Sequence, residues 1–388
     1  MKESQTLAMA RRSREMKNAG HDVISLSLGE PDFNTPEFIK EGVKQAVDAN
    51  FSHYTAVPGL QEVREAIVLK FKRDNNLEFT PDQIIMSTGA KQSLAQIMLA
   101  ILNPGDEVIL PAPYWVSYLQ MVELAEGNAV EISTEAANDY KITPDQLRAA
   151  ITDKTKAFLF SSPCNPSGSL YSKDELQGLA DVLKDYPNVL IISDEIYELI
   201  NFAGKHESIA QFDAVKNQTV IVNGLSKGYA MTGYRLGYIA GPKHIVNACT
   251  KIQGQITSAT CAITQKAAQV ALEADPSSVK YMRDSFLERR DYVYGELSTI
   301  ENLVLPKPEG AFYLFPDVSG FFGKTFKGKI IETSADFAEF LLDTEFVATV
   351  DGSAFGSPKC LRLSYAAGMD TLKEAVIRIK RFVSNIED

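Results

Sequence analysis

One lysine of this 388-residue chain has neighbours that would make its amine reactive. Lys227 follows the apolar run Thr219–Val222 among closely spaced glycines, and Arg235 comes eight residues later. A nearby fixed cation lowers the pKa of a lysine, and the neutral amine can form a Schiff base with a carbonyl. Ser226 adds a hydroxyl, and the glycines let the backbone approach a ligand. A phosphorylated aldehyde would use all of these groups, the amine for its carbonyl and Ser226 with Arg235 for its phosphate.

Pyridoxal 5′-phosphate (PLP) is such an aldehyde. A lone Lys-Gly pair would more simply be a solvated surface turn. However, the string from Ser226 to Gly237 reads Ser-Lys-x-x-x-Met-x-Gly-x-Arg-x-Gly, which resembles the cofactor-lysine motif of the class I aminotransferases. The resemblance extends from about Ser25 to Ala366 and is strongest to the bacterial aspartate aminotransferase branch. It implies PLP as cofactor, attached to Lys227.

A second motif places an acid at the end of an apolar run. Asp194 follows Val189–Ser193, and a buried carboxylate requires a partner. A protonated pyridine nitrogen would be one, and the cationic ring would then accept electrons from the substrate. The alternative is that Asp194 caps a helix. Tyr197 completes an Asp-x-x-Tyr motif similar to that of the family, in which the tyrosine contacts the phenolic oxygen of the cofactor.

The loop Ser161–Gly168 is rich in proline and by itself indicates only a turn. It resembles the family's Asn-x-Pro-x-Asn-Pro-Thr-Gly, so Asn165 matches the amide that donates to the phenolic oxygen and borders the substrate. Ser161 and Ser167 depart from the pattern, which has Asn and Thr there.

A phosphate loop is expected at Ser87–Gln92. The segment joins a strand to a helix, and the free N–H groups and dipole of a helix N-terminus suit a phosphate. The resemblance assigns Gly89, Ala90 and Lys91 to this loop. Gly224, in contrast, stands where many relatives have a second phosphate-binding serine.

Two aromatic residues are assigned by resemblance alone. Trp115 is the only tryptophan, and tryptophan is most often a core residue. The family pattern instead implies that its ring stacks on the pyridine and borders the substrate. His53-Tyr54 resembles the segment whose tyrosine reaches the phosphate of the neighbouring subunit, which implies a homodimer with shared sites.

The substrate residues expected are Gly29, Arg362 and Lys91. Arg362 interrupts an apolar run, where an arginine needs an anion. The alternative partner is a structural carboxylate, whereas the family role is a clamp on the substrate α-carboxylate. Gly29 matches a backbone position that approaches the substrate. For Lys91 we expect a contact with the distal carboxylate of a dicarboxylic substrate, assisted by Ser4 or Thr6.

Composition limits the classes of function. A net charge of −11 argues against nucleic acid or an anionic membrane as partner. No stretch reaches the ~18 apolar residues of a membrane span, and the first residues lack a secretory leader, so a cytoplasmic protein is expected. The four cysteines form no Cys-x-x-Cys pair and are expected to be reduced, and the four histidines show no metal-binding spacing.

Apolar runs of strand length alternate with segments of helical periodicity through the middle of the chain, which predicts an α/β fold with a mostly parallel sheet. The resemblance implies the fold of type I PLP-dependent transferases. We expect a large PLP-binding domain at 31–277 and a smaller α+β domain formed by 1–30 and 278–388. The predicted strands are Ile84–Thr88, Glu107–Leu110, Ala129–Ile132, Ala157–Ser161, Val189–Ser193, Thr219–Asn223 and Arg235–Ala240, and the predicted helices Lys91–Leu102, Lys173–Lys184, Pro242–Gln253, Met282–Leu297 and Leu372–Val383.

The function expected is PLP-dependent transfer of the amino group of L-aspartate to 2-oxoglutarate, giving oxaloacetate and L-glutamate. Lys227 would hold the cofactor and act as general base. The alternatives with the same cofactor are a prephenate or other amino-acid aminotransferase and a β-lyase. A PLP-fold regulator would need a DNA-binding extension, for which there is no room before Ser25. A nucleotide-binding protein would need a glycine-rich loop that is missing from the sequence.

Overall fold

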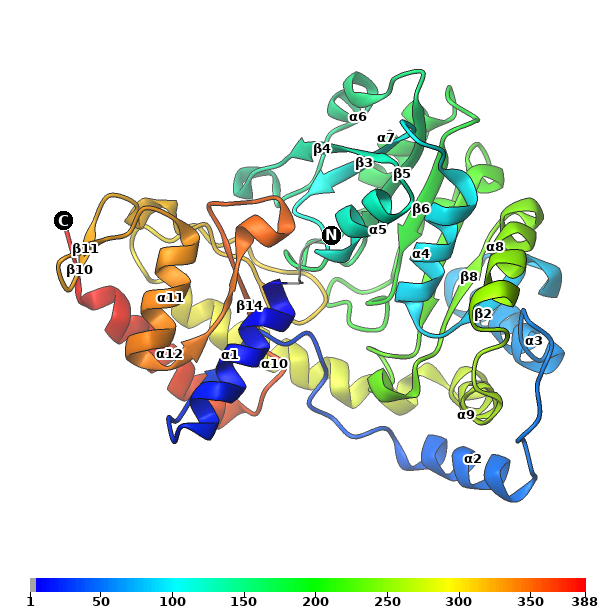
Figure 1. Cartoon of the computed structure of the whole chain (residues 1–388), viewed down its shortest axis with the longest axis horizontal. Coiled ribbons are helices and arrows are strands. Elements are labelled where there is room, and N and C mark those ends of the chain that lie inside the picture. The colour runs from blue at the N-terminus through cyan, green and yellow to red at the C-terminus, as the bar shows by residue number, and fades with distance from the viewer. Residues whose placement is uncertain (1–4) are drawn as a thin grey trace.

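The computed structural model describes residues 5–388 and shows a large α/β unit joined to a smaller one (Figure 1). The largest sheet in this range has seven strands in the order β2-β8-β7-β6-β5-β3-β4. β8 is antiparallel to both of its neighbours, and the remaining neighbours are parallel. The strands are β2 (Ile84–Ser87), β3 (Glu107–Ala112), β4 (Asn128–Ser133), β5 (Thr155–Ser161), β6 (Leu190–Asp194), β7 (Thr219–Gly224) and β8 (Gly237–Ala240).

Helices cover both faces of this sheet because its central strands are apolar on both sides. Ile85 packs with the helices of one face, whereas Ile84 and Met86 pack with those of the other, as the two-residue repeat of a strand requires. The first face carries α4 (Ala90–Ile101), α5 (Ser117–Leu124) and α8 (Lys243–Ile256). The second carries α2 (Glu37–Asp48), α3 (Gln61–Lys70), α6 (Pro144–Ala150), α7 (Lys173–Leu183) and α9 (Ala262–Glu273).

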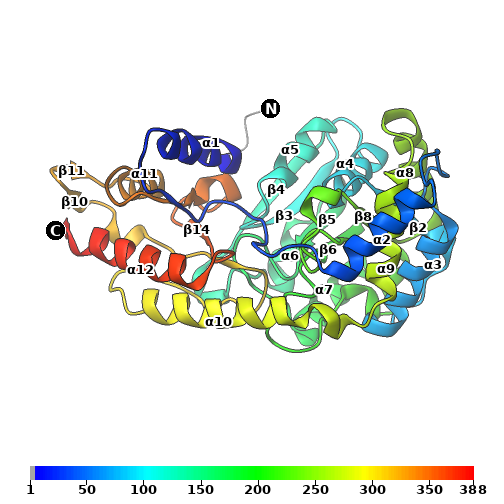
Figure 2. The same cartoon turned by 90° about the horizontal axis from the view of Figure 1, so that it is seen from below.

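The smaller unit is built from both ends of the described chain. α10 (Lys280–Leu297) runs from the large unit into the small one, where α12 (Met369–Ser384) packs along it (Figure 2). β1 (Ile24–Ser25) pairs in parallel with β12 (Val347–Ala348), which brings the N-terminal segment back onto the C-terminal unit as expected. The other elements are α1 (Gln5–Asn18), α11 (Ser334–Glu345), β9 (Tyr313–Leu314), β10 (Thr325–Phe326), β11 (Lys329–Ile330), β13 (Val350–Asp351), β14 (Leu361–Ser364) and β15 (Ile386–Glu387).

The predicted mostly parallel α/β sheet is confirmed, and each predicted strand corresponds to an observed one. Three predicted ends were wrong: Thr88 and Val189 each lie one residue outside their strands, and Arg235 lies two residues before β8. The backbone of Arg235 is left-handed, with φ of 54°, which a strand cannot accommodate. The division at 277/278 stays a prediction, and it falls in the short η7 helix (Pro276–Val279) before α10. All four cysteines are free, three of them buried. Among residues 5–388 no helix is long and apolar enough to cross a membrane.

Candidate active site

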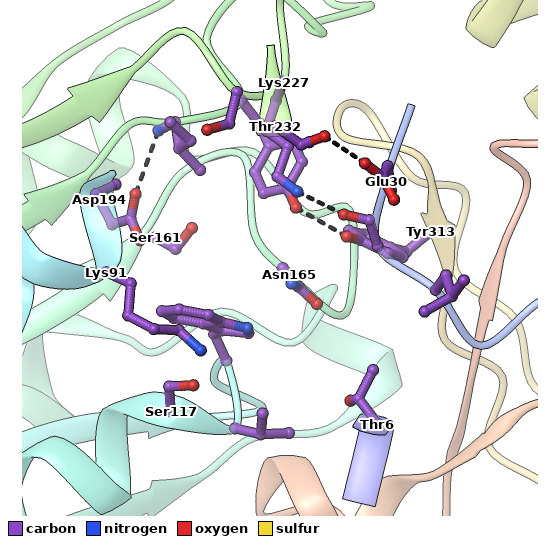
Figure 3. A pocket seen from close by; sticks show the side chains of 18 of the residues that line it. Thr6, Glu30, Lys91, Ser117, Ser161, Asn165, Asp194, Lys227, Thr232 and Tyr313 are labelled. Carbon is purple, nitrogen blue, oxygen red and sulfur yellow. Dashed lines mark hydrogen bonds between the residues drawn. The ribbon is translucent and has the colours of Figure 1, made fainter. Parts of the chain in front are cut away.

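A cavity of about 340 Å³ opens at the carboxyl ends of the parallel strands, beside the small unit (Figure 3). Ligands bind in this position in α/β sheets. Its wall combines the turns after β6 and β7, the N-terminus of α4, the start of α5, and residues of α1, β9 and β14. The sequence-predicted residues that line it are Gly29, Ala90, Lys91, Trp115, Asn165, Asp194, Tyr197, Ser226, Lys227, Arg235 and Arg362.

Lys227 projects into this cavity and is not a solvated turn residue. Its amine donates to the carbonyl oxygen of Gly29 at 2.5 Å. Burial, with the Arg362 and Arg235 guanidinium groups, lowers the pKa of Lys227 to about 8 against the opposing charge of Glu30. The sequence predicted a lowered pKa from Arg235 alone, but burial is the larger cause. A substantial fraction of Lys227 is therefore a neutral amine near pH 8.

Asp194 ends β6 and is also buried against the cavity. Its Oδ2 accepts from the Tyr118 hydroxyl at 2.6 Å, and its Oδ1 accepts from the backbone N–H of Ile196 at 3.2 Å. Burial raises the pKa of Asp194 to about 6 in spite of these hydrogen bonds. The carboxylate thus stabilises its own turn and faces the cavity. The helix-cap alternative is wrong, because residues 196–199 form a turn and no helix begins there.

Tyr197 and Asn165 line the cavity from separate turns, and Figure 3 shows the Asn165 side chain within it. The Tyr197 hydroxyl lies 2.8 Å from that of Tyr313. Burial raises the pKa of Tyr197 well above its usual value, so the phenol is neutral and can donate a hydrogen bond. The side-chain oxygen of Asn165 accepts from Arg362, which leaves its amide nitrogen available as a donor.

The N-terminus of α4 forms an anion-binding corner. Gly89 caps this helix with φ of 85°, and a Cβ there would lie 2.5 Å from the Arg235 guanidinium. Glycine therefore leaves room for the Arg235 guanidinium beside the helix N-terminus, and the buried Ser226 lines the same cavity. A Cβ at Gly237 would collide with the backbone nitrogen of Ala90. The corner thus requires glycine at both positions, at Gly89 because of the Arg235 side chain and at Gly237 because of the backbone of Ala90.

Gly224 has a packing reason for lacking a hydroxyl. A Cβ there would lie 2.9 Å from both the Cα of Gly237 and the carbonyl oxygen of Leu236. A serine would have to push β7 and β8 apart, so glycine suits the close approach of these two strands.

Lys91 lies at the mouth of the cavity, with its amine 4.8 Å from the centroid of the Trp115 ring. Burial of the amine and repulsion by Arg235 lower its pKa, although other parts of the side chain remain exposed. Figure 3 shows Lys91 extended beside the indole, with Thr6 of α1 across the opening. Ser4, the other residue expected near Lys91, lies outside the described residues.

Arg362 is 1% exposed and lies in β14. Its guanidinium donates to Asn165 Oδ1 at 3.0 Å and to the carbonyl oxygen of Ser27 at 2.6 Å, and its Nε has no partner among the described residues. Within the same range it forms no ion pair, so the structural-carboxylate alternative is not observed. A buried guanidinium with only neutral acceptors favours an anion from outside the chain.

Tyr54 does not reach this cavity. Its side chain is 97% exposed, and it is not among the lining residues. An aromatic residue with this exposure agrees with a role across a subunit interface, which remains a prediction.

Sequence reasoning missed several lining residues. Tyr118 holds Asp194, Tyr313 bonds Tyr197, and Thr232 donates to the Glu30 carboxylate at the cavity mouth. Tyr118 could have been found from the Pro-Tyr-Trp-Val-Ser-Tyr string that ends with it. Tyr313 carries no comparable local signal, because its position depends on the packing of β9.

The comparisons with known proteins agree with this geometry. The family described as aminotransferase class I and II matches residues 21–379. An aspartate/prephenate aminotransferase of Cereibacter sphaeroides is 46% identical over 390 residues, covering 100% of this chain and 97% of the relative. An aspartate aminotransferase of Bacillus subtilis is 45% identical over 382 residues, with 98% and 96% covered.

Solved structures of this family have the same fold. The aspartate aminotransferase of Rhizobium meliloti superposes with a TM-score of 0.97 at 42% identity, covering 100% of this chain and 98% of the other. The enzyme from Thermus thermophilus with maleate gives 0.92 at 37% identity, with 98% and 97% covered. On the sequence match and the shared fold, the chain belongs to the class I and II aminotransferases.

Proposed function

We propose that this aminotransferase uses PLP to transfer the amino group of L-aspartate to 2-oxoglutarate, giving oxaloacetate and L-glutamate. The observation that carries the proposal is the convergence of Lys227, Asp194 and Arg362 on one cavity. An amine of lowered pKa, a buried acid and an unpaired buried guanidinium are the groups that an aldehyde, a pyridine and an amino-acid carboxylate require. We place the reaction in the cytoplasm, where free cysteines stay reduced.

The residues present fit PLP. Lys227 would attach to its aldehyde, and Asp194 would face its pyridine nitrogen. Ser226, Arg235 and the N–H groups at Gly89 and Ala90 would hold its phosphate, because they form the anion-binding corner. The ring contacts would come from Trp115 on a face, and from Asn165 and Tyr197 at the phenolic oxygen. When bound, PLP supplies a carbonyl and an electron-accepting ring.

Other residues of the chain would bind the substrate and remove its proton. Arg362 would fix the α-carboxylate of the substrate, while the backbone at Gly29 lies beside it. Lys227 would act as the general base that removes the proton from the substrate Cα, a contribution of ~10²–10⁴-fold in rate. The contact of its amine with the Gly29 carbonyl oxygen supports this role, because Gly29 is a residue proposed to lie beside the substrate.

Lys91 would bind the distal carboxylate of aspartate and glutamate, with Thr6 assisting. The cationic amine at the cavity mouth, 4.8 Å from the centroid of the Trp115 ring, supports this assignment. The Thermus thermophilus relative was solved with maleate, which is a four-carbon dicarboxylate. Prephenate is a second candidate substrate, since the Cereibacter sphaeroides relative is named for both.

We further propose a homodimer in which Tyr54 reaches the phosphate of its partner. The 97% exposure of this tyrosine supports a contact outside its own subunit. Mixing Tyr54→Phe and Lys227→Ala subunits tests it. In the hybrid, one of the two sites lacks both residues and the other retains both, so the mixture should regain activity above the sum of the two parents. No gain, with exchange of subunits verified by mass, would argue against shared sites.

Borohydride reduction of the protein with PLP, followed by peptide mapping, is the main test of this function. The expected adduct is on Lys227, and the protein should convert aspartate and 2-oxoglutarate in a coupled assay. An adduct on another lysine, or no turnover with any amino donor, would overturn the proposal.

A further inference from the structure

Behind the candidate active site lies a buried ionic network that sequence motifs did not indicate. The end of β6 and the turn that follows it contain two pairs of residues whose side chains point in different directions. Asp194 and Tyr197 line the cavity, while Glu195 and Glu198 point into the protein, where they are 1% and 8% exposed.

The carboxylate of Glu195 is bound by three donors from two segments. Ser193 and Ser208 donate to Oε1 at 2.9 and 2.6 Å, and the Nε2 atom of His206 lies 3.0 Å from Oε2. The backbone N–H of Glu195 also donates to the carbonyl oxygen of Val222 in β7 at 2.9 Å. The turn is thus attached to the 206–208 loop and to the neighbouring strand.

Glu198 connects the same turn to the end of α3. It forms an ion pair with Lys70, the last residue of that helix, and accepts from Asn75 at 3.3 Å. Lys70 also donates to Asn75 at 2.8 Å and lies 3.9 Å from Asp74. The side chain of Lys70 is 3% exposed, so the ion pair is shielded from solvent.

The charges of the network nearly cancel. Burial opposes the charged form of His206, but the Glu195 and Glu198 carboxylates outweigh it and raise its pKa. The protonated form of His206, together with Lys70, would oppose the Glu195 and Glu198 carboxylates, with Asp74 at the edge. Glu195, Glu198 and His206 place ligand atoms within 4.8 Å of one another. A divalent cation there would have to displace Lys70 from Glu198, so the ion pair is favoured over a metal.

We propose that Lys70, Glu195, Glu198 and His206 form a positioning network that sets the depth of Asp194 and Tyr197 in the cavity. None of the four lines the cavity, so they would act through the turn. The inference rests on the proposed function, because it assigns a role for that function to the surroundings of Asp194. Buried ionic groups contribute little net stability compared with apolar groups of equal volume, and in some proteins they select one geometry.

The first test is Glu195→Gln, with Glu78→Gln as the matched control. Glu78 is an exposed carboxylate paired with Lys72. The control therefore loses the same charge, but at a position that is exposed to solvent. We expect Glu195→Gln to lower kcat about ten- to a hundredfold, since small displacements of catalytic groups have effects of this size. The KM for 2-oxoglutarate should stay within about twofold, because Arg362 and Lys91 are untouched.

PLP affinity gives a readout other than turnover. Trp115 is the only tryptophan and lines the cavity, so quenching of its fluorescence reports PLP binding to the apoprotein. The Kd for PLP should rise about tenfold in Glu195→Gln and stay unchanged in Glu78→Gln. Identical Kd and kcat values in both variants would overturn the positioning role.

A second variant covers the case in which Glu195→Gln fails to fold. Lys70→Met/Glu198→Leu replaces the ion pair with apolar groups of similar volume, and its melting temperature should be close to that of the wild type. We expect this folded variant still to lose kcat and PLP affinity. Wild-type values of both would show that the network is only structural. A fall in the wild-type melting temperature on adding EDTA would also contradict the proposal and indicate a metal.

These experiments distinguish failure of the proposed function from failure of the positioning role. If wild-type protein forms no borohydride-fixed adduct at Lys227, the PLP assignment fails before the network is tested. If the wild type forms the adduct and both network variants behave like Glu78→Gln, only the positioning role fails.

Discussion

Arg362 Nη1 donates to Asn165 Oδ1 at 3.0 Å, across 197 positions of sequence. This hydrogen bond joins β14 of the small unit to the loop after β5 of the large one. The residue proposed for the substrate carboxylate is therefore held by the residue proposed for the phenolic oxygen of PLP. The proposed contacts with the substrate carboxylate and with the phenolic oxygen are thus linked by this hydrogen bond, so displacement of either residue should affect both contacts.

Replacement of Arg362 by Lys should lower kcat/KM for aspartate and for alanine alike. Lysine keeps the charge but loses the planar pair of donors that a carboxylate accepts. A charge-assisted hydrogen bond contributes about 1.5–3 kcal/mol, so the expected loss is roughly ten- to a hundredfold. Steady-state kinetics with both donors measure it. An effect confined to aspartate would mean that Arg362 does not bind the α-carboxylate.

Replacement of Lys91 by Ala should separate substrates by their distal group. Loss of the cation should cut kcat/KM for aspartate roughly ten- to a hundredfold and change that for alanine or aromatic amino acids much less. Arg362→Lys is the matched comparison, because it should affect all donors. An equal loss for every donor after Lys91→Ala would show that Lys91 supports PLP or the fold.

The amide variant Asp194→Asn should bind PLP but remove the substrate α-proton slowly. An amide cannot stabilise a protonated ring nitrogen, whereas it can still accept the Tyr118 hydrogen bond observed at 2.6 Å. Single-turnover reactions with aspartate, followed by absorbance, measure this step. An unchanged rate would exclude the electronic role, and loss of folding would show that the turn contact to Ile196 dominates.

The apoprotein variant Lys227→Met should be more stable than wild-type apoprotein at pH 7. The folded pKa of Lys227 is about 8, below its usual value of 10.5, so burying the charged form costs free energy at low pH. The penalty is fully present below pH 8 and disappears as the pH rises to about 10.5. The expected advantage is on the order of 3 kcal/mol at pH 7, because the pKa is lowered from 10.5 to about 8. Urea unfolding at pH 7 and pH 10 measures it; an advantage that grows with pH would contradict the lowered pKa.

Much of the site could be predicted because its signals are local. Asp194 ends an apolar run, Lys227 follows one, and Gly89 joins a strand to a helix, so each lies at the carboxyl end of a strand wherever the strand is placed. Parallel strands bring those ends to one edge of the sheet. Residue type and spacing thus determined the α/β fold and most of the cavity.

Only the tertiary structure decided which side chains support these groups. Tyr118 meets Asp194 across 76 positions, and Tyr197 meets Tyr313 across 116. No local sequence pattern indicates these partners, because strand order and helix packing bring them together. The sequence also did not indicate how deeply Lys227 and Asp194 are buried. Burial is the main cause of their shifted pKa values. Sequence placed the reactive residues along one edge, and the packing of distant segments set their protonation and surroundings, because desolvation depends on three-dimensional neighbours.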